Sequence, residues 1–220
     1  MFKKIALLCL WPVLCFSQDK EENPNAGRFM VGFRTTVSSF SDIGYVGFGT
    51  GAHVRIQLGP RINSEWYYDH ISTDIGGLGS RTDEHIGWSV MFYTFGQHLE
   101  KGKFSPYVEA GNCFDYTEVK SSYNGGSMAS RGSAAVHLGM GTHYNLSEKA
   151  DITFKAQYMI HLGTAINETI TTDEVTGAKN LVITKGNTGL NGHLLMTCSV
   201  NFYLGRLWKG YLFGKKSKNL

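Results

Sequence analysis

The sequence predicts an all-β fold, namely an eight-stranded antiparallel up-and-down transmembrane β-barrel. Three observations lead to this prediction: an export signal at the start, eight later segments that alternate apolar and polar residues, and connections that alternate between short and long. Alternation with a period of two is typical of strands with one apolar and one polar face. Short turns at one rim and long loops at the other are typical of membrane barrels.

The export signal comes first in the chain. MFKKIALLCLWPVLCFSQDK places two lysines before an apolar stretch that runs from Ile5 to Phe16 and ends at the small residue Ser17. We predict a signal peptide over residues 1–17, cleaved near Ser17. It is too short for a membrane-spanning helix, which needs about 20 apolar residues. Cys15 lacks the small preceding residues of a lipidation site, so residues 18–27 are expected to form a short, unanchored periplasmic segment.

Eight stretches carry the alternation, and each is interpreted as one strand. The clearest is ADITFKAQYMIHLG, in which Phe154 and Tyr158 alternate with Lys155 and Gln157. The predicted barrel spans residues 28–204, with strands at 28–37, 51–58, 62–72, 85–95, 105–117, 133–146, 150–163 and 193–204.

The connections differ in length in a regular way. Those after the second, fourth and sixth segments are short, and the first of them is Gly59-Pro60-Arg61. The other four are rich in Gly, Ser, Thr and Asp, and the longest runs from about 164 to 189. In a meander, alternate connections lie at the same end, so four long loops are predicted at one rim and both termini at the other.

Alternation alone leaves open which face is inside, because a soluble barrel would bury its apolar face. Here the polar face is a poor exterior, since it carries few charges and includes Met30 and Tyr67. Its charges can also compensate one another: Arg55 and Glu65 are equidistant from Pro60 and should face each other. An eight-stranded interior is just wide enough for side chains, and charges inside it need partners. We therefore predict a lumen charge network of Arg34, Arg55, Glu65, Glu109 and Lys155.

Aromatic residues share the apolar face and become more frequent toward the segment ends. Such residues form girdles where a barrel meets the two membrane interfaces. The predicted girdle residues are Trp66, Tyr68, Trp88, Tyr116, Tyr144, Tyr158 and Phe202.

In this pattern, over roughly residues 28–204, the chain resembles the small eight-stranded outer-membrane barrels of the OmpA transmembrane-domain and OmpX-like class, as found in Bacteroidetes-type bacteria. The resemblance implies an outer-membrane location, a filled interior and insertion by the cell's barrel-assembly machinery. It does not imply a particular function.

The chain departs from that class at its end, because residues 205–220 form a basic, aromatic tail after the last strand. Leu207, Trp208, Tyr211 and Leu212 could form one face of a short helix lying on the membrane surface. A solvated tail is an equal alternative.

No catalytic set emerges from the sequence. Outer-membrane lipid A deacylases use a His-x-Ser pair, but glycine replaces the serine after both His137-Leu138 and His161-Leu162. A nucleophilic serine also needs a base on the same face.

No metal or other cofactor is predicted either. The inward histidines, among them His53 and His143, come from different strands and heights, and Asp83-Glu84-His85 is expected to be solvated near a rim. Cys113 and Cys198 are expected to be unpaired, because they fall on opposite faces of non-adjacent strands.

The predicted function is therefore that of a non-enzymatic integral outer-membrane barrel. Its plugged polar lumen excludes solute passage, and its four long loops give it a structural or surface-interaction role. Its expected partners are outer-membrane lipid and a surface partner of the loops. The net charge is +3, but the tail contains five basic residues and no acid, so the rest of the mature chain is slightly acidic. This argues against nucleic-acid binding by the folded body. A monomer is favoured, although the sequence leaves the oligomeric state open. Two alternatives remain: a secreted soluble barrel that binds a small apolar ligand, and a lipid-modifying outer-membrane enzyme.

Overall fold

The computed structural model describes residues 26–40, 44–122 and 126–208, apart from the side chains of 40 and 187–189. The predicted signal peptide and most of the predicted periplasmic segment and tail lie outside these residues. Within the described residues, no helix has the length and apolarity needed to cross a membrane.

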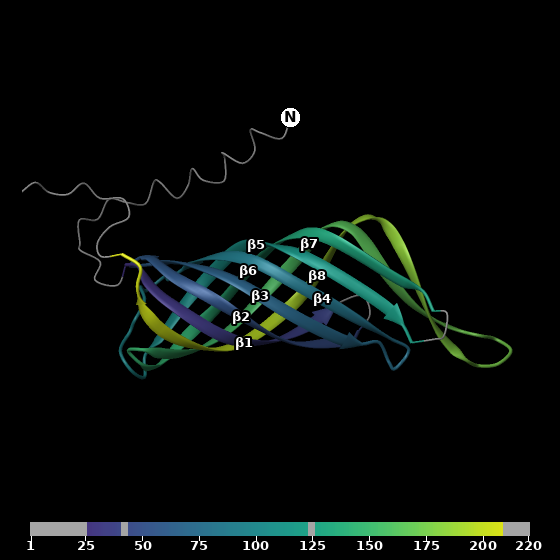
Figure 1. Cartoon of the computed structure of the whole chain (residues 1–220), viewed down its shortest axis with the longest axis horizontal. Coiled ribbons are helices and arrows are strands. Elements are labelled where there is room, and N and C mark those ends of the chain that lie inside the picture. The colour runs from purple at the N-terminus through teal and green to yellow at the C-terminus, as the bar shows by residue number, and fades with distance from the viewer. Residues whose placement is uncertain (1–25, 41–43, 123–125, 209–220) are drawn as a thin grey trace, which may run out of the picture.

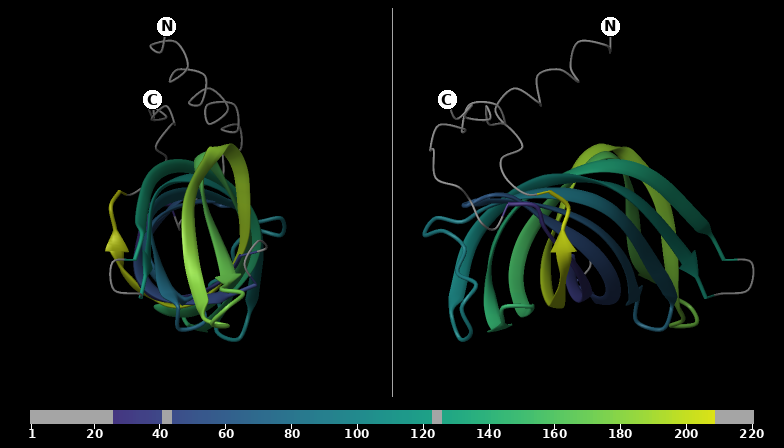
Figure 2. Two further views of the ribbon diagram at one scale, coloured as in Figure 1. Left: turned by 90° about the vertical axis from the view of Figure 1, so that its right-hand side faces the viewer. Right: turned by 60° about the vertical axis from the view of Figure 1, so that its left-hand side comes forward.

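Eight antiparallel strands pair in sequence order, and the last pairs with the first to close a barrel (Figures 1 and 2). This confirms the predicted fold. The strands are β1 (Arg28–Phe40), β2 (Val46–Gly59), β3 (Ile62–Asp74), β4 (Gly79–Phe92), β5 (Phe104–Ser121), β6 (Met128–Ser147), β7 (Ala150–Thr172) and β8 (Lys179–Arg206).

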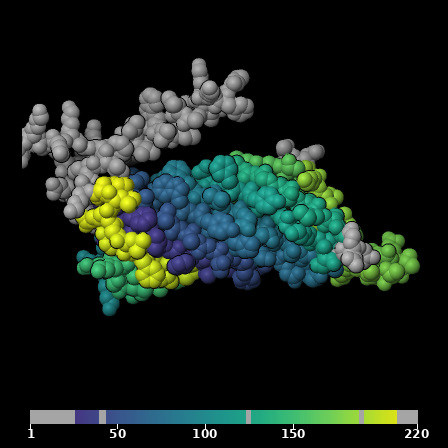
Figure 3. All heavy atoms as spheres, in the orientation of Figure 1, coloured from purple at the N-terminus to yellow at the C-terminus, as the bar shows by residue number. Residues whose placement is uncertain are grey.

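The barrel has its apolar face outside and its charged face inside. On the outer wall Phe33 is 71% exposed and Leu138 69% exposed, whereas the inward Arg34 and Glu65 are each 2% exposed. The strands pack into a continuous wall on the face seen in Figure 3. In a water-soluble barrel the apolar side chains would be buried and the charges exposed, so this chain has the inverse arrangement.

The strands are longer than the sequence predicted, and the predicted long loops are mostly strand. The stretch from 164 to 189 is not a loop: β7 continues to Thr172, β8 starts at Lys179, and the two stay paired over this part. Beyond the part of the wall that is apolar outside, a strand does not need an apolar face. Backbone hydrogen bonds between the two strands of a hairpin are enough to extend the sheet there. Polar Thr and Asn residues therefore hid these extensions from the alternation pattern.

The asymmetry between the two ends nevertheless exists, in a different form. Among the fully described connections, the longest irregular one is 93–103, which lies at the end predicted to have short turns. The other end has overhanging strands, and the β7–β8 hairpin projects furthest (Figure 1). Strand β1 begins and β8 ends at the short-turn end, where Arg28 pairs with Arg206.

A β-bulge in β7 changes which residues face inward. The pairing of β7 with β8 shifts between Thr164 and Ile166. Before the shift even-numbered residues point outward, as Leu162 does at 46% exposure, whereas Ile166 beyond it is 4% exposed. The extra residue of a bulge inverts the alternation, so Ile166 and Glu168 enter the interior.

Candidate functional site: the filled barrel interior

Side chains fill the interior in successive layers. Along β4 the inward residues Met91, Ser89, His85, Asp83 and Arg81 rise from the short-turn end toward the β7–β8 hairpin, and all are buried. Because side chains alternate along a strand, successive inward residues lie at different heights in the lumen. The interior is therefore a stack of polar and apolar layers.

Four of the five predicted lumen charges meet in one layer. Lys155 Nζ lies 2.9 Å from Glu65 Oε1 and 3.2 Å from Glu109 Oε1. Arg34 Nη1 lies 3.4 Å from the same Glu65 oxygen. These residues come from β1, β3, β5 and β7, so the ion pairs cross the lumen rather than follow neighbouring strands.

One further charge, Asp69, completes this layer, and the ring of Tyr67 borders it. The sequence reasoning had included neither in the charge network. Arg34 Nε lies 2.8 Å from Asp69 Oδ1, with both side chains fully buried. The Arg34 guanidinium also lies 4.5 Å from the centre of the Tyr67 ring. Asp69 has the inward parity of Glu65 on the same strand, and that parity was the signal that could have identified it.

The fifth predicted charge, Arg55, belongs to a separate cluster. Arg55 and Glu65 are register partners, as expected. The Arg55 guanidinium, however, lies 2.6 Å from Asp151 Oδ2 and 3.0 Å from His143 Nδ1. This cluster is closer to the short-turn end than the charged layer is. The predicted single network is therefore wrong for Arg55. Its long side chain reaches the opposite wall, where Asp151 offers a carboxylate, while Lys155 and Arg34 occupy Glu65.

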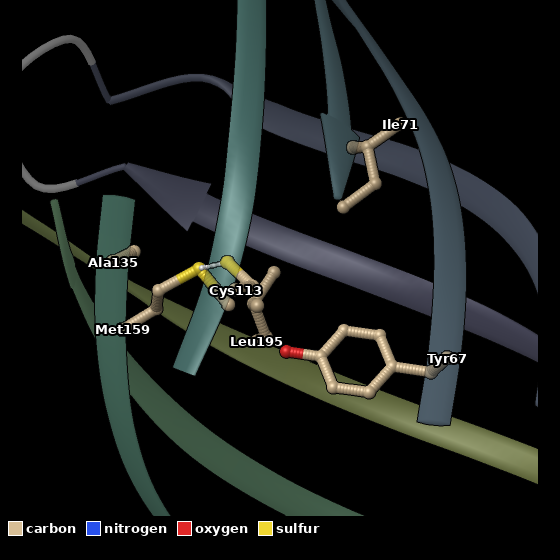
Figure 4. Packing of buried hydrophobic residues seen from close by; sticks show 6 residues of the cluster. All are labelled: Tyr67, Ile71, Cys113, Ala135, Met159 and Leu195. Atoms are coloured by element: carbon tan, nitrogen blue, oxygen red, sulfur yellow. Dashed lines mark hydrogen bonds between the residues drawn. The ribbon is translucent and has the colours of Figure 1, made fainter. Parts of the chain in front are cut away.

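An apolar layer separates this charged layer from the next. It consists of Tyr67, Ile71, Cys113, Ala135, Met159 and Leu195, which point toward one another in Figure 4. The Cys113 thiol lies 3.5 Å from the Met159 sulfur. Cys113 and Cys198 are both free, one buried and one exposed, as predicted.

A second polar layer lies beyond it and was missed by the sequence reasoning. Arg81 holds Asp83 through both its Nε and Nη2 atoms, and its Nη1 lies 3.2 Å from Glu168. Asp115 and Arg131 complete the layer, with 3.8 Å between Oδ2 and Nη2. The sequence analysis expected Asp83 to be solvated, but it is fully buried because β4 extends to Gly79 and carries it inside.

An apolar cluster closes the hairpin end of the interior. Ile75, Val119, Ala129, Ile166 and Leu181 are buried there, and Tyr45, Leu78 and Ile183 pack against them. Buried side chains therefore lie at successive levels of the described barrel.

The predicted girdle residues all lie on the outer wall, but not all lie near strand ends. Six are 37–50% exposed, whereas Tyr144 is partly covered by Phe104, with 4.8 Å between the ring centres. Trp66 and Trp88 are register partners with ring centres 6.4 Å apart, toward the middle of β3 and β4.

The histidines of the two glycine-substituted motifs are both enclosed. His137 Nε2 lies 2.9 Å from Ser89 Oγ, and its Nδ1 lies 3.5 Å from the Tyr67 hydroxyl. Ser89 is fully buried. The Tyr67 hydroxyl lies at His137 Nδ1, where a catalytic triad would have a carboxylate. The pair fits interior packing rather than attack on a substrate.

The overall shape matches known small outer-membrane barrels. Neisserial surface protein A aligns with a TM-score of 0.55 and 15% identity, over 81% of this chain and 98% of that one. A major outer membrane protein of Thermus thermophilus aligns with a TM-score of 0.53 and 8% identity, over 80% and 99%. The N-terminal β-barrel domain of Pseudomonas aeruginosa OprF gives 0.50 and 11%, over 83% and 100%.

At these identities the match shows the fold alone. No protein-family model matches the sequence, and no curated protein matches it. The chain has the fold of an outer-membrane β-barrel, and any finer function must be argued from its own residues.

Proposed function

We propose that this protein is a non-enzymatic integral barrel of the bacterial outer membrane, surrounded by lipid and with a closed interior. One observation carries the proposal: large apolar side chains cover the outer wall while ion pairs fill the inside. Phe114 is 70% exposed on β5, yet its neighbour Asp115 is 3% exposed. Hydrocarbon around the barrel favours the exposure of Phe114, and ion-pair partners within the lumen permit the burial of Asp115.

The polar outer residues suit such a position. On the hairpin side of the apolar band, Glu84 accepts a hydrogen bond from the Tyr68 hydroxyl and pairs with His70 at 2.6 Å. Lys120 pairs with Glu118 at a similar level of the next strand. Charged pairs of this kind fit the headgroup region, where water is available to them.

The stacked layers support a structural role over transport. Ion pairs cross the lumen at three levels, and apolar clusters lie between and beyond them. Eight strands leave little room beyond such side chains. The same contents argue against a soluble barrel with a small apolar ligand inside, because the ligand would have to displace paired charges.

The β7–β8 hairpin is the surface most suited to contact with a partner outside the cell. Its turn is built by Asp173, whose carboxylate accepts backbone hydrogen bonds from Thr176 at 2.8 Å and Val175 at 2.9 Å. These bonds hold the pKa of Asp173 below its usual value. Val175, at the tip, is 93% exposed.

Cell fractionation tests the location. We expect the full-length chain in the detergent-soluble envelope, migrating differently on gels before and after boiling, as folded barrels do. The matched control is a chain that starts at residue 18, which should not reach the envelope. Recovery of the full-length chain from the periplasm without detergent would overturn the proposal.

Tag accessibility and conductance test the orientation and the closed lumen. An epitope inserted between Thr176 and Gly177 should be accessible to antibody on intact cells. The same epitope between Glu148 and Lys149, at the other end, should become accessible only after the outer membrane is opened. In planar bilayers the purified barrel should show no large, stable conductance steps, and such steps would contradict a closed lumen.

A further inference from the structure

Three histidines from distant parts of the chain meet inside the barrel. His85 of β4, His161 of β7 and His193 of β8 are all buried. Their ring centres are 6.1 Å apart for His85 and His161, 5.6 Å for His85 and His193, and 4.9 Å for His161 and His193. One ring nitrogen from each lies within 4.8 Å of the others.

A carboxylate lies beside this cluster. Asp115 Oδ2 is 3.0 Å from His161 Nδ1, and Asp115 Oδ1 is 3.3 Å from His85 Nε2. Oδ2 also accepts a hydrogen bond from Ser133, which helps to fix the carboxylate in place, and it lies 3.1 Å from Thr117 Oγ1. Oδ1 is buried and makes no hydrogen bond, so it is available to coordinate an ion.

Two of the three imidazoles, those of His85 and His161, lack good hydrogen bonds. Neither nitrogen of His85 nor either nitrogen of His161 has a well-aligned hydrogen bond, although all are buried. Buried polar groups without hydrogen bonds are costly. By contrast, Asp83 nearby is held by Arg81 and by Thr117, so it has less capacity for another partner.

From this arrangement we propose that the barrel interior binds one divalent transition-metal ion through His85, His161, His193 and Asp115. Three imidazoles and one carboxylate suit Zn²⁺ and related first-row dications, which favour nitrogen ligands. This replaces the sequence-based expectation of no metal. The sequence had placed His85 near a solvated rim and had not considered His193, whose partners come from strands far apart in the chain.

The geometry needs only small adjustments. A tetrahedral ion with bonds of about 2.0–2.1 Å requires ligand atoms about 3.4 Å apart. Nitrogens within 4.8 Å of one another reach that spacing if each moves by less than about 1 Å. Rotation of the imidazoles about their side-chain bonds can provide this movement.

The site would be structural. Four protein ligands leave no open position for a substrate. The ligands come from β4, β5, β7 and β8, so the ion would join two strand pairs on opposite sides of the lumen. Because packed layers enclose the cluster, the ion is expected to enter during folding.

Metal retention by the refolded full chain tests the proposal. The protein is refolded from urea into detergent micelles with Zn²⁺ present, dialysed without metal, and its zinc content and heat-modifiable gel mobility are measured. We expect about one Zn²⁺ per folded chain, and a higher unfolding temperature than for protein refolded with chelator. Co²⁺ in place of Zn²⁺ should give the visible absorption bands of a tetrahedral site.

Single variants assign the ligands. H85N, H161N and H193N should each lose affinity by more than about 100-fold, since even residues that only orient a ligand contribute about 10–100-fold. H137N removes another buried imidazole outside the cluster, and H70N an exposed one beside Glu84, and both should keep the ion. Folded wild-type protein that retains no Zn²⁺, or retention unchanged in the three cluster variants, would overturn the site. Where a variant does not fold, D115N and the cobalt spectrum decide, since replacing the carboxylate ligand by a neutral amide must alter that spectrum.

Discussion

The most direct test of the interior charge layer is the replacement of Lys155 by methionine. Lys155 Nζ contacts both Glu65, at 2.9 Å, and Glu109, at 3.2 Å, and all three side chains are nearly fully buried. Methionine keeps much of the volume but leaves the two carboxylates without this cation. Arg34 remains 3.4 Å from Glu65, whereas Glu109 loses its nearest positive partner.

The expected cost follows from that difference. Removing one partner of a buried ion pair costs about 3–5 kcal/mol. Because Glu65 keeps Arg34, we expect a loss near the lower limit, about 3 kcal/mol of unfolding free energy. The layer contains two cations, Arg34 and Lys155, and three carboxylates, the third being Asp69. E109Q balances these charges, so it should cost only about 1 kcal/mol.

A double-mutant cycle measures the interaction itself. In the K155M background E109Q should restore stability, with a coupling energy of about 2 kcal/mol. Urea unfolding in micelles, followed by tryptophan fluorescence and gel mobility, supplies the free energies, and K149M in an exposed turn serves as the control. If K155M unfolds within about 0.5 kcal/mol of the wild type, or if E109Q costs as much as K155M, the ion-pair reasoning is refuted.

Three other predictions follow from the wall and the hairpin. L138K, on the outer wall, should cost about 2–4 kcal/mol in lipid, while V175K at the hairpin tip should cost nothing; equal stabilities in lipid vesicles would mean that the wall does not face hydrocarbon. G87A would place a Cβ 2.2 Å from the Tyr67 ring, so it should cost about 1–3 kcal/mol in urea titrations, and less in a Y67L background. Replacing 171–180 by an Asn-Gly turn should leave the gel mobility shift and the urea midpoint nearly unchanged, because the closing cluster remains, whereas loss of the shift would show that the overhang stabilises the barrel.

Much of the barrel was predictable because alternation is a local property. Phe154 and Lys155 are neighbours in sequence, and whatever the barrel's radius they must point to opposite faces. The sequence also indicated which face points inward. Arg34, Glu65, Glu109 and Lys155 are too few charges for a water-exposed surface, but inside the lumen their charges can pair.

The strand ends could not be predicted in this way. The stretch from 164 to 172 alternates poorly, since both of its faces meet polar surroundings, and a bulge shifts its parity at Ala165. This stretch is a strand because it pairs with β8, whose residues lie on the other side of the turn. The alternation within 164–172 carries no information about that pairing.

The amino-acid sequence by itself determined the class of fold and the side of the wall on which each residue of the predicted segments lies, because both depend on the period of the chain. Only the tertiary structure decided which inward residues meet. The height of each residue depends on the stagger between strands as the sheet closes, and a side chain can cross the narrow lumen to a strand that is not its neighbour. For this reason Arg55 pairs with Asp151 instead of Glu65, and His85, His161 and His193 come together from three strands.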